Sequence, residues 1–181
     1  MIRHKLKIPI TKKNLLKIRA GDEILLSGTL FGARDAAHKR MIETLQKDKP
    51  LPFNLENAAI FYVGPSPAPP GKISGSIGPT TSARMDAFTE PLLQKGAKIF
   101  IGKGARSSLI KDLLKKYKGI YLVAIGGISA LTAEKVLSIK PIAYHDLGPE
   151  ALYNIQVKDL PLFAAYDAYG GDIFEEALRN A

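Results

Sequence analysis

Three short stretches of the sequence combine glycine-containing turns with cations and hydroxyl groups. They are 76–88 "SIGPTTSARMDAF", 31–40 "FGARDAAHKR" and 99–108 "IFIGKGARSS". Together they contain Arg34, Arg84 and Lys103 as cations and Thr80 and Thr81 as hydroxyls. Guanidinium groups hold carboxylates through parallel hydrogen bonds, and such charge-assisted bonds are each worth roughly 1.5–3 kcal/mol. If the fold gathers these turns, we expect a site for a small dicarboxylate.

The stretch around Gly78-Pro79 also has a purely structural interpretation. Thr80 or Thr81 could cap a helix, with the hydroxyl accepting a hydrogen bond from a backbone N–H. One threonine is enough for a cap, however, and Arg84 follows within the first turn, where its charge opposes the helix dipole. The free N–H groups of a helix start favour an anion, which would explain such an arginine. The pattern therefore favours binding over capping, with Asp86 as a neighbouring candidate.

The other two turns remain open between binding and packing. Arg34 and His38 are four residues apart and share a helical face. Asp35 could cap the helix, orient a neighbour, or form an acid/base pair with His38. The alternative is an exposed arginine and a packed histidine. Lys103 lies in a strand-Gly-Lys-Gly-helix turn that lacks P-loop spacing, so it could face either an anion or solvent.

Composition limits the class of protein. The chain has 181 residues, 46% hydrophobic and 24% charged, which is typical of one globular domain over 1–181. It has no cysteine, so it offers no disulfide, no thiol nucleophile and no thiolate ligand, and we expect no metal held by this chain. The start lacks the apolar core of a signal peptide. The least polar run has 13 residues, fewer than the roughly 20 that span a bilayer. We therefore expect a cytoplasmic protein without membrane contact.

The formal net charge of +9 raises the possibility of a nucleic-acid partner. The lysines are spread over many segments, without a basic tail and without interleaved aromatic residues. This distribution favours a solvated basic surface whose overall field attracts small anions. We expect no nucleic-acid binding; a steep salt dependence of DNA affinity would be the sign of the alternative.

The order of expected elements indicates an α/β fold. Strands are predicted at 6–10, 23–33, 58–64, 97–104 and 120–127. Helices are predicted at 11–18, 34–48, 80–96, 105–119 and 129–139. Two strands near 153–159 and 161–167 and a helix near 172–179 follow. The alternation predicts parallel strands in the middle of a mixed sheet, with sites at the strand-to-helix turns.

Individual residues predict where some of these helices begin, which side they bury and where they bend. Thr11 is expected to cap the first helix. Ala37, Met41 and Leu45 form one stripe of the second helix, and Met85, Phe88 and Leu92 or Leu93 point inward from the third. Pro91 should kink or divide that third helix. The Pro- and Gly-rich segment 64–79 is expected to be a long, ordered, irregular loop.

The motifs "GPTTSARMD", "GARDAAHKR" and "IGKGARSS" resemble the β subunit of class I (iron–sulfur) fumarate hydratase and the related L-tartrate dehydratase β subunit. The resemblance runs from "LSGTLFGARDAAH" to "LGPEALYNIQVKDLPLFAAYDAYGGDIF" and so covers nearly the whole chain. It implies a swivelling β/β/α fold and a fumarase-type β-subunit domain over 1–181. It also implies an α2β2 assembly in which a partner α subunit carries a [4Fe-4S] cluster, which fits the absence of cysteine here.

The same resemblance implies roles for individual residues. Arg34, Arg84 and Lys103 match residues that bind the substrate. Thr80 matches the base that exchanges the carbon-bound proton, and Thr81 matches its neighbour, which hydrogen-bonds substrate. The implied reaction is the reversible hydration of fumarate to L-malate; dehydration of L-tartrate and a non-catalytic anion-binding module are the alternatives. Asp35, His38 and Asp86 remain supporting candidates.

Overall fold

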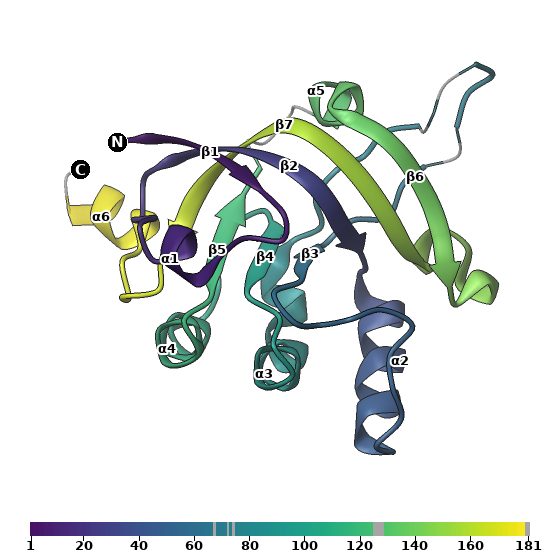
Figure 1. Cartoon of the computed structure of the whole chain (residues 1–181), viewed down its shortest axis with the longest axis horizontal. Helices are drawn as coiled ribbons and strands as arrows, with labels where there is room; N and C mark the ends of the chain where they lie inside the picture. The colour runs from purple at the N-terminus through teal and green to yellow at the C-terminus, as the bar shows by residue number, and fades with distance from the viewer. Residues whose placement is uncertain (67, 72, 74, 125–128, 180–181) are drawn as a thin grey trace.

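The apolar runs form a strongly curved sheet in the computed structural model, which describes residues 1–66, 68–71, 73, 75–124 and 129–179 (Figure 1). Among these residues the sheet has seven strands in the order β1-β2-β3-β4-β5-β7-β6. Their bounds are Arg3–Lys7 (β1), Glu23–Gly32 (β2), Ala59–Phe61 (β3), Ile99–Gly102 (β4), Ile120–Val123 (β5), Val136–Ala143 (β6) and Leu152–Tyr166 (β7).

The sheet is mixed, as predicted. Strands β1 to β5 pair in parallel with their neighbours, whereas β7 runs antiparallel to β2, β5 and β6. Because β7 pairs with both β2 and β5, it bends the sheet into the arch seen in Figure 1. The parallel directions of β2, β3 and β4 bring the ends of these strands, and the turns that follow, to one edge of the sheet.

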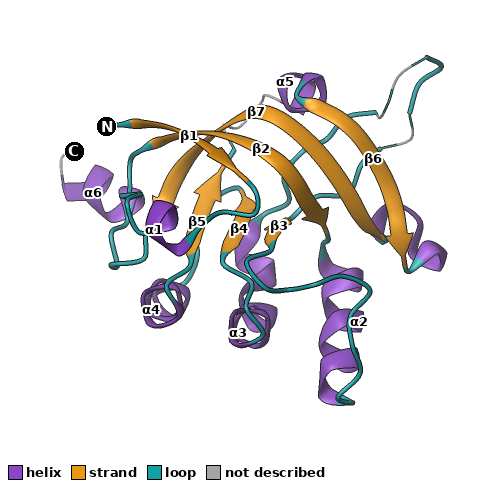
Figure 2. Ribbon diagram, viewed as in Figure 1, coloured by secondary structure: helices purple, strands orange, loops and turns teal. Residues whose placement is uncertain are grey.

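The helices pack against the sheet, and three clusters of buried apolar residues form among the described residues. Helices α2 (Asp35–Gln46), α3 (Asp86–Gln94) and α4 (Ser108–Tyr117) lie along one face (Figure 2). Buried residues of β3 to β5 pack there against Leu92 and Leu114, and a second core fills the inside of the arch. The remaining helices are α1 (Lys12–Leu15), α5 (Ser129–Glu134), α6 (Ile173–Arg179) and the short 3-10 helices η1 (Ser82–Met85) and η2 (His145–Glu150).

Most predicted elements are confirmed, including the α/β class with flanking helices. The Thr11 hydroxyl caps α1 by accepting from the Asn14 N–H at 3.3 Å. Ala37 and Met41 are buried and Leu45 packs partly against the core. The strand predicted at 120–127 is confirmed as far as Val123, and its last residues lie outside the described part. None of the described helices combines the length and hydrophobicity that a bilayer crossing requires.

Two predictions near the C-terminus are wrong. The helix predicted at 129–139 ends at Glu134, and Val136–Ala143 forms strand β6 instead. Spaced apolar residues fit a helix there, but Pro141 disfavours one, and pairing with β7 satisfies the backbone. The two strands predicted near 153–159 and 161–167 are one 15-residue strand, because Pro161 pairs opposite Leu25 without ending it.

Two predictions on strand and helix bounds also need correction. The first strand is Arg3–Lys7 rather than 6–10. The helix predicted over 80–96 starts as the 3-10 turn η1 and becomes an α-helix only at Asp86, so the division precedes Asp86. Helix α3 continues through Pro91, so Pro91 does not divide the helix. Pro91 removes one N–H donor, and the carbonyl left without it belongs to the exposed residue Ala87.

Candidate active site at the ends of the parallel strands

The backbone ties the three predicted turns together. Strand β3 lies between β2 and β4, so the turns after these strands are neighbours. The N–H of Thr80 donates to the Tyr62 carbonyl at 2.7 Å, just after β3. Thr81 and Lys103 form a parallel bridge, and the N–H of Ser82 donates to the Lys103 carbonyl at 3.0 Å. Thr80, Thr81 and Lys103 therefore lie on one continuous edge.

The threonine hydroxyls do not act as helix caps. Thr81 is the residue before η1, yet its side chain makes no capping hydrogen bond. Among the described residues, neither hydroxyl has a hydrogen-bond partner, and the Lys103 ammonium has no ion-pair partner. Thr81 and Lys103 are exposed and Thr80 is half-buried. This leaves two hydroxyls and one ammonium free to contact a bound molecule.

Arg84 is held by the first residue of α2. Its Nε donates to Asp35 Oδ1 at 2.9 Å, and its Nη2 lies 2.7 Å from Asp35 Oδ2. This ion pair, with one hydrogen bond and one further close contact between the charged groups, joins η1 to α2 and places the guanidinium beside the turn after β2. Of the roles considered for Asp35, the geometry supports orienting a neighbour. The Arg84 side chain remains 57% exposed, so the pair leaves one face of the guanidinium open.

Arg34 is held by Glu150, a residue that the sequence did not indicate. Arg34 Nη2 donates to Glu150 Oε1 at 2.8 Å, while Glu150 Oε2 accepts from the Ala36 N–H at 2.9 Å. The carboxylate thus fixes the arginine and caps α2 from across the fold. Hydrogen bonds from Arg34 and from the Ala36 N–H lower the pKa of Glu150. Gly64 makes room, since a Cβ there would lie 3.1 Å from Arg34 Cδ.

His38 faces the core and not the turns. Its ring is buried, and burial lowers its pKa to about 4, so the ring is neutral at pH 7. Nδ1 lies 3.1 Å from the Arg34 carbonyl, which only accepts, so Nδ1 carries the proton. The ring packs edge-on to Tyr62 and against Phe88. An acid/base pair with Asp35 is not what this geometry supports; His38 instead supports the backbone of Arg34.

Asp86 belongs to a buried network below the turns. It accepts from Arg106 Nε at 2.8 Å and from the Ser107 N–H at 3.1 Å. The Arg106 side chain is fully buried and also donates to Tyr62 and Thr89. Asp86 therefore holds the start of α4 against α3 through Arg106. Its engagement in this network argues against direct contact with a ligand.

Ser82 is a second residue that sequence reasoning missed. Its buried Oγ accepts from the Lys103 N–H at 3.1 Å and lies 2.8 Å from the Tyr121 hydroxyl. Tyr121 in turn donates to the Gly104 carbonyl at 2.8 Å. A Cβ at Gly102 would lie 1.9 Å from Ser82 Oγ, so this contact requires glycine. The Ser82 hydroxyl thus links the turn that contains Thr80 and Thr81 to the turn that contains Lys103.

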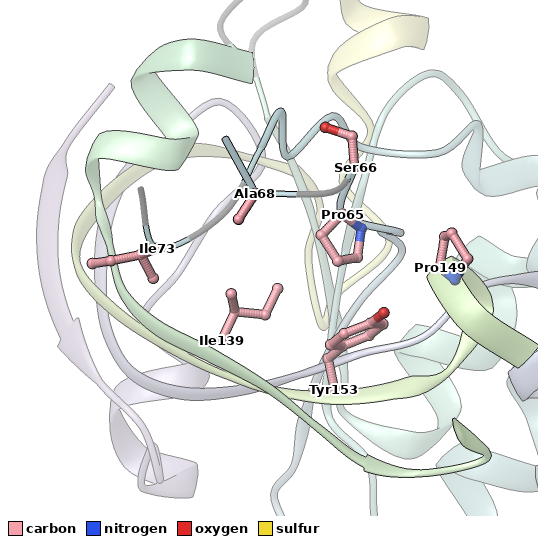
Figure 3. Close-up of a pocket in the computed structure, with 7 residues that line it drawn as sticks. All are labelled: Pro65, Ser66, Ala68, Ile73, Ile139, Pro149 and Tyr153. Carbon is pink, nitrogen blue, oxygen red and sulfur yellow. The ribbon is translucent and has the colours of Figure 1, made fainter. Parts of the chain in front are cut away.

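A hollow of about 240 Å³ lies beside the turns, between the loop after β3 and the β6–β7 hairpin. It is lined by Pro65, Ser66, Ala68, Ile73, Ile139, Pro149 and Tyr153, whose side chains surround it in Figure 3. These walls are mainly apolar and include none of the three predicted cations. The hollow is therefore a poor match for a dicarboxylate.

The chain offers few donor groups for a metal ion. Among the described residues, no three histidine or acidic side chains gather into a group that could hold a metal ion. The full sequence has no cysteine, so the chain does not fit an iron–sulfur cluster held by thiolates.

Comparison with known proteins places the chain in a family. The family model described as Fumarase C-terminus matches residues 1–177. The chain belongs to this family. It is 36% identical over 177 residues to the putative L(+)-tartrate dehydratase subunit beta of Methanocaldococcus jannaschii, covering 94% of this chain and 91% of that protein. It is 36% identical over 176 residues to L(+)-tartrate dehydratase subunit beta of Escherichia coli, covering 94% and 86%.

The chain is also similar to one part of longer proteins named as fumarate hydratases. The chain is 39% identical over 178 residues to fumarate hydratase 2 of Leishmania major, which covers 96% of this chain but 31% of that protein. It therefore spans about a third of such relatives and nearly the full length of the beta subunits.

Proposed function

We propose that this chain is the β subunit of a two-subunit hydro-lyase that reversibly hydrates fumarate to L-malate. The observation that carries the proposal is the meeting of Arg34, Arg84, Lys103 and two free hydroxyls at one sheet edge. Membership of the family supports hydro-lyase chemistry. The partner would be an α subunit bearing a [4Fe-4S] cluster, in an α2β2 assembly in the cytoplasm.

The two arginines are suited to the carboxylates of the substrate. Arg34 uses Nη2 for Glu150, which leaves Nη1, whereas its Nε is buried and has no partner among the described residues. Arg84 uses Nε and Nη2 for Asp35, which leaves Nη1. Each guanidinium is thus oriented by an acid of its own chain and keeps N–H groups for an incoming carboxylate. Lys103 adds a third charge beside them.

The hydroxyl of Thr80 is proposed to exchange the proton at carbon. In the dehydration direction, this proton leaves the carbon next to a carboxylate while hydroxide leaves the neighbouring carbon; hydration reverses both. The electron pair left on carbon is delocalised into that carboxylate, where Arg34, Arg84 and Lys103 offset the added charge. The same cations favour the deprotonated form of a nearby hydroxyl, as opposite charges favour any anion. Thr81 would hydrogen-bond the substrate.

The leaving hydroxyl needs an electrophile that this chain does not supply. When bound by the partner, the cluster would supply a Lewis-acidic iron. Since the chain has no thiolate to hold such a cluster, its own contribution is confined to binding, orientation and proton transfer.

A second candidate reaction is dehydration of L-tartrate. The relatives that the chain matches over nearly their full length carry that name. Tartrate is also a four-carbon dicarboxylate, so the same arginines would serve it.

The experiment is an anaerobic assay of the mixed subunits. The chain and its reconstituted α subunit are mixed, and the loss of fumarate and of L-tartrate is followed separately, with each subunit alone as a control. Activity on fumarate in the mixture alone supports the proposal. Activity of the mixture on L-tartrate and not on fumarate would mean that L-tartrate is the substrate. A formed complex with an intact cluster and no activity would contradict catalysis and favour the anion-binding module.

A further inference from the structure

A second cationic hollow, of about 320 Å³, lies at the opposite edge of the sheet. Four lysines line it: Lys12, Lys98, Lys116 and Lys118. Lys98 directly precedes β4, whereas Lys103 directly follows it. At about 3.3 Å per residue, the α-carbons of these two lysines are roughly 16 Å apart. The lysine pocket, as we call this hollow, is therefore separate from the candidate active site.

The charge of the lysine pocket is only partly compensated. Lys98 Nζ donates to the Tyr117 carbonyl at 2.6 Å, and Lys118 Nζ donates to the Ala168 carbonyl at 3.3 Å. Carbonyl groups satisfy hydrogen bonds but leave the positive charge in place. Lys116 alone of the four has a carboxylate within 4 Å among the described residues, at 3.6 Å from Glu90. Burial and the nearby charge of Lys12 lower the pKa of Lys98.

The type of cation distinguishes the two edges. The candidate active site presents arginines, whose planar fork matches a carboxylate. The lysine pocket presents only ammonium groups, which act as compact point charges with rotatable donors and suit a tetrahedral phosphate. Its remaining wall includes the apolar side chains of Ile10 and Leu15 and the ring of Tyr117. The volume is at the lower end of the range for small-molecule sites, about 300–1,000 Å³.

We propose that the lysine pocket binds a small organic phosphate, with the phosphate among Lys12, Lys98 and Lys118 and the apolar body against Ile10 and Leu15. This site is independent of the hydro-lyase function. It would place a phosphate-sensing surface on the face of the chain that the dicarboxylate does not reach.

Phenyl phosphate is the simplest probe with both parts, and phenol and inorganic phosphate each carry one of them. The full chain is titrated with each at low ionic strength, and backbone amide shifts are followed by two-dimensional NMR. We expect saturable shifts around residues 10–18, 56–58, 96–98 and 115–118 with phenyl phosphate, weaker binding of inorganic phosphate, and none of phenol.

Charge-matched variants separate the pocket from the general field of the protein. Lys98→Met and Lys12→Met should each weaken phenyl phosphate binding about tenfold, the loss expected for one charge-assisted hydrogen bond. Lys158→Met removes an equal charge from an exposed site on β7 and should change affinity less than about twofold. Lys12 is exposed, so its variant tests the site even if Lys98→Met unfolds.

Three outcomes would overturn the proposal. Equal weakening by Lys158→Met would mean that the overall charge attracts the probe. Shifts confined to the turns after β2, β3 and β4 would place the phosphate in the candidate active site. Absence of saturable binding of both phosphates would mean that the lysine pocket has no ligand of this class.

Discussion

Replacing Glu150 by glutamine tests whether a distant carboxylate positions Arg34. The carboxylate accepts from Arg34 Nη2 at 2.8 Å with one oxygen and from the Ala36 N–H at 2.9 Å with the other. Glutamine keeps one acceptor and turns an N–H₂ group toward the second donor. The isosteric change therefore breaks one of the two contacts and removes the charge from the other.

The expected loss of stability in Glu150→Gln follows from the two contacts of the carboxylate. A lost side-chain cap costs about 0.5–2 kcal/mol, and a half-exposed ion pair is worth about 0–1 kcal/mol after solvent screening. The side chains of Arg34 and Glu150 are 33% and 28% exposed, so we expect the stability of Glu150→Gln to fall by about 1–2 kcal/mol. With Arg34 no longer fixed, kcat/KM for the dicarboxylate should fall about tenfold or more, mainly through KM.

The pH dependence supplies a signature of this carboxylate. The Arg34 hydrogen bond and the Ala36 N–H lower the folded-state pKa of Glu150 below its ordinary value of 4.5. Its stabilisation is therefore complete above pH 4.5 and is lost as pH falls through the lowered pKa. Urea unfolding of the wild type and of Glu150→Gln is measured from pH 7 to pH 3. The difference between their free energies of unfolding should become smaller below pH 4.5.

A matched control lies on the same segment. Asp146, also in η2, binds Arg40 of α2 through two hydrogen bonds of 2.7 and 2.9 Å at the exposed surface. Asp146→Asn removes the same charge from the same pair of elements but touches neither Arg34 nor the turns. It should leave kcat/KM unchanged. Wild-type kcat/KM in Glu150→Gln, or an equal loss in Asp146→Asn, would refute the positioning role.

Four further predictions concern the turns and the residues below them. Thr80→Val should lower kcat in the assembled enzyme about 10²–10⁴-fold while gel filtration shows normal assembly; near wild-type turnover would exclude it as the base. Arg84→Lys should lower kcat/KM at least about tenfold, because lysine lacks the fork; unchanged kinetics would make Arg84 structural. Gly102→Ala should cost about 1–3 kcal/mol or more in thermal unfolding, since its Cβ would meet Ser82 Oγ; a wild-type Tm would contradict that contact. The buried His38 should titrate near pH 4 by NMR, and stability should fall as pH drops from about 6.5 toward 4 because the unfolded state takes up the proton first; a titration near 6.5 would mean an accessible ring.

The edge that carries the site was predictable from the sequence because it depends on local signals. Each turn lies after one of the parallel strands β2, β3 and β4 and contains a glycine in its motif, and parallel strands bring such turns together. The backbone bridge between Thr81 and Lys103 shows that two of these turns are adjacent. The capping alternative was also open to sequence reasoning, but only the geometry shows that the Thr81 hydroxyl makes no cap bond.

The partners of the two arginines were not predictable in the same way. Glu150 lies 116 residues after Arg34, in a stretch that resembles the family but to which no role was assigned, and only the path of the chain through η2 and β7 brings it near. Asp86 was grouped with the site by proximity in sequence, yet the buried Arg106 binds it below the turns. Long-range ion pairs depend on tertiary packing, which local periodicity does not encode.

The exposure of the charged groups limits how strongly the site of this chain alone can bind a carboxylate. Arg84 is 57% exposed, and Thr81 and Lys103 are exposed at the same edge. A carboxylate bound there in open water would gain little, since exposed ion pairs are worth about 0–1 kcal/mol. The same charges become far stronger when a second surface excludes water and lowers the local dielectric constant. Arg84, oriented by Asp35 and largely exposed, and Arg34, oriented by Glu150 and one-third exposed, therefore fit the proposal that a partner subunit completes the site.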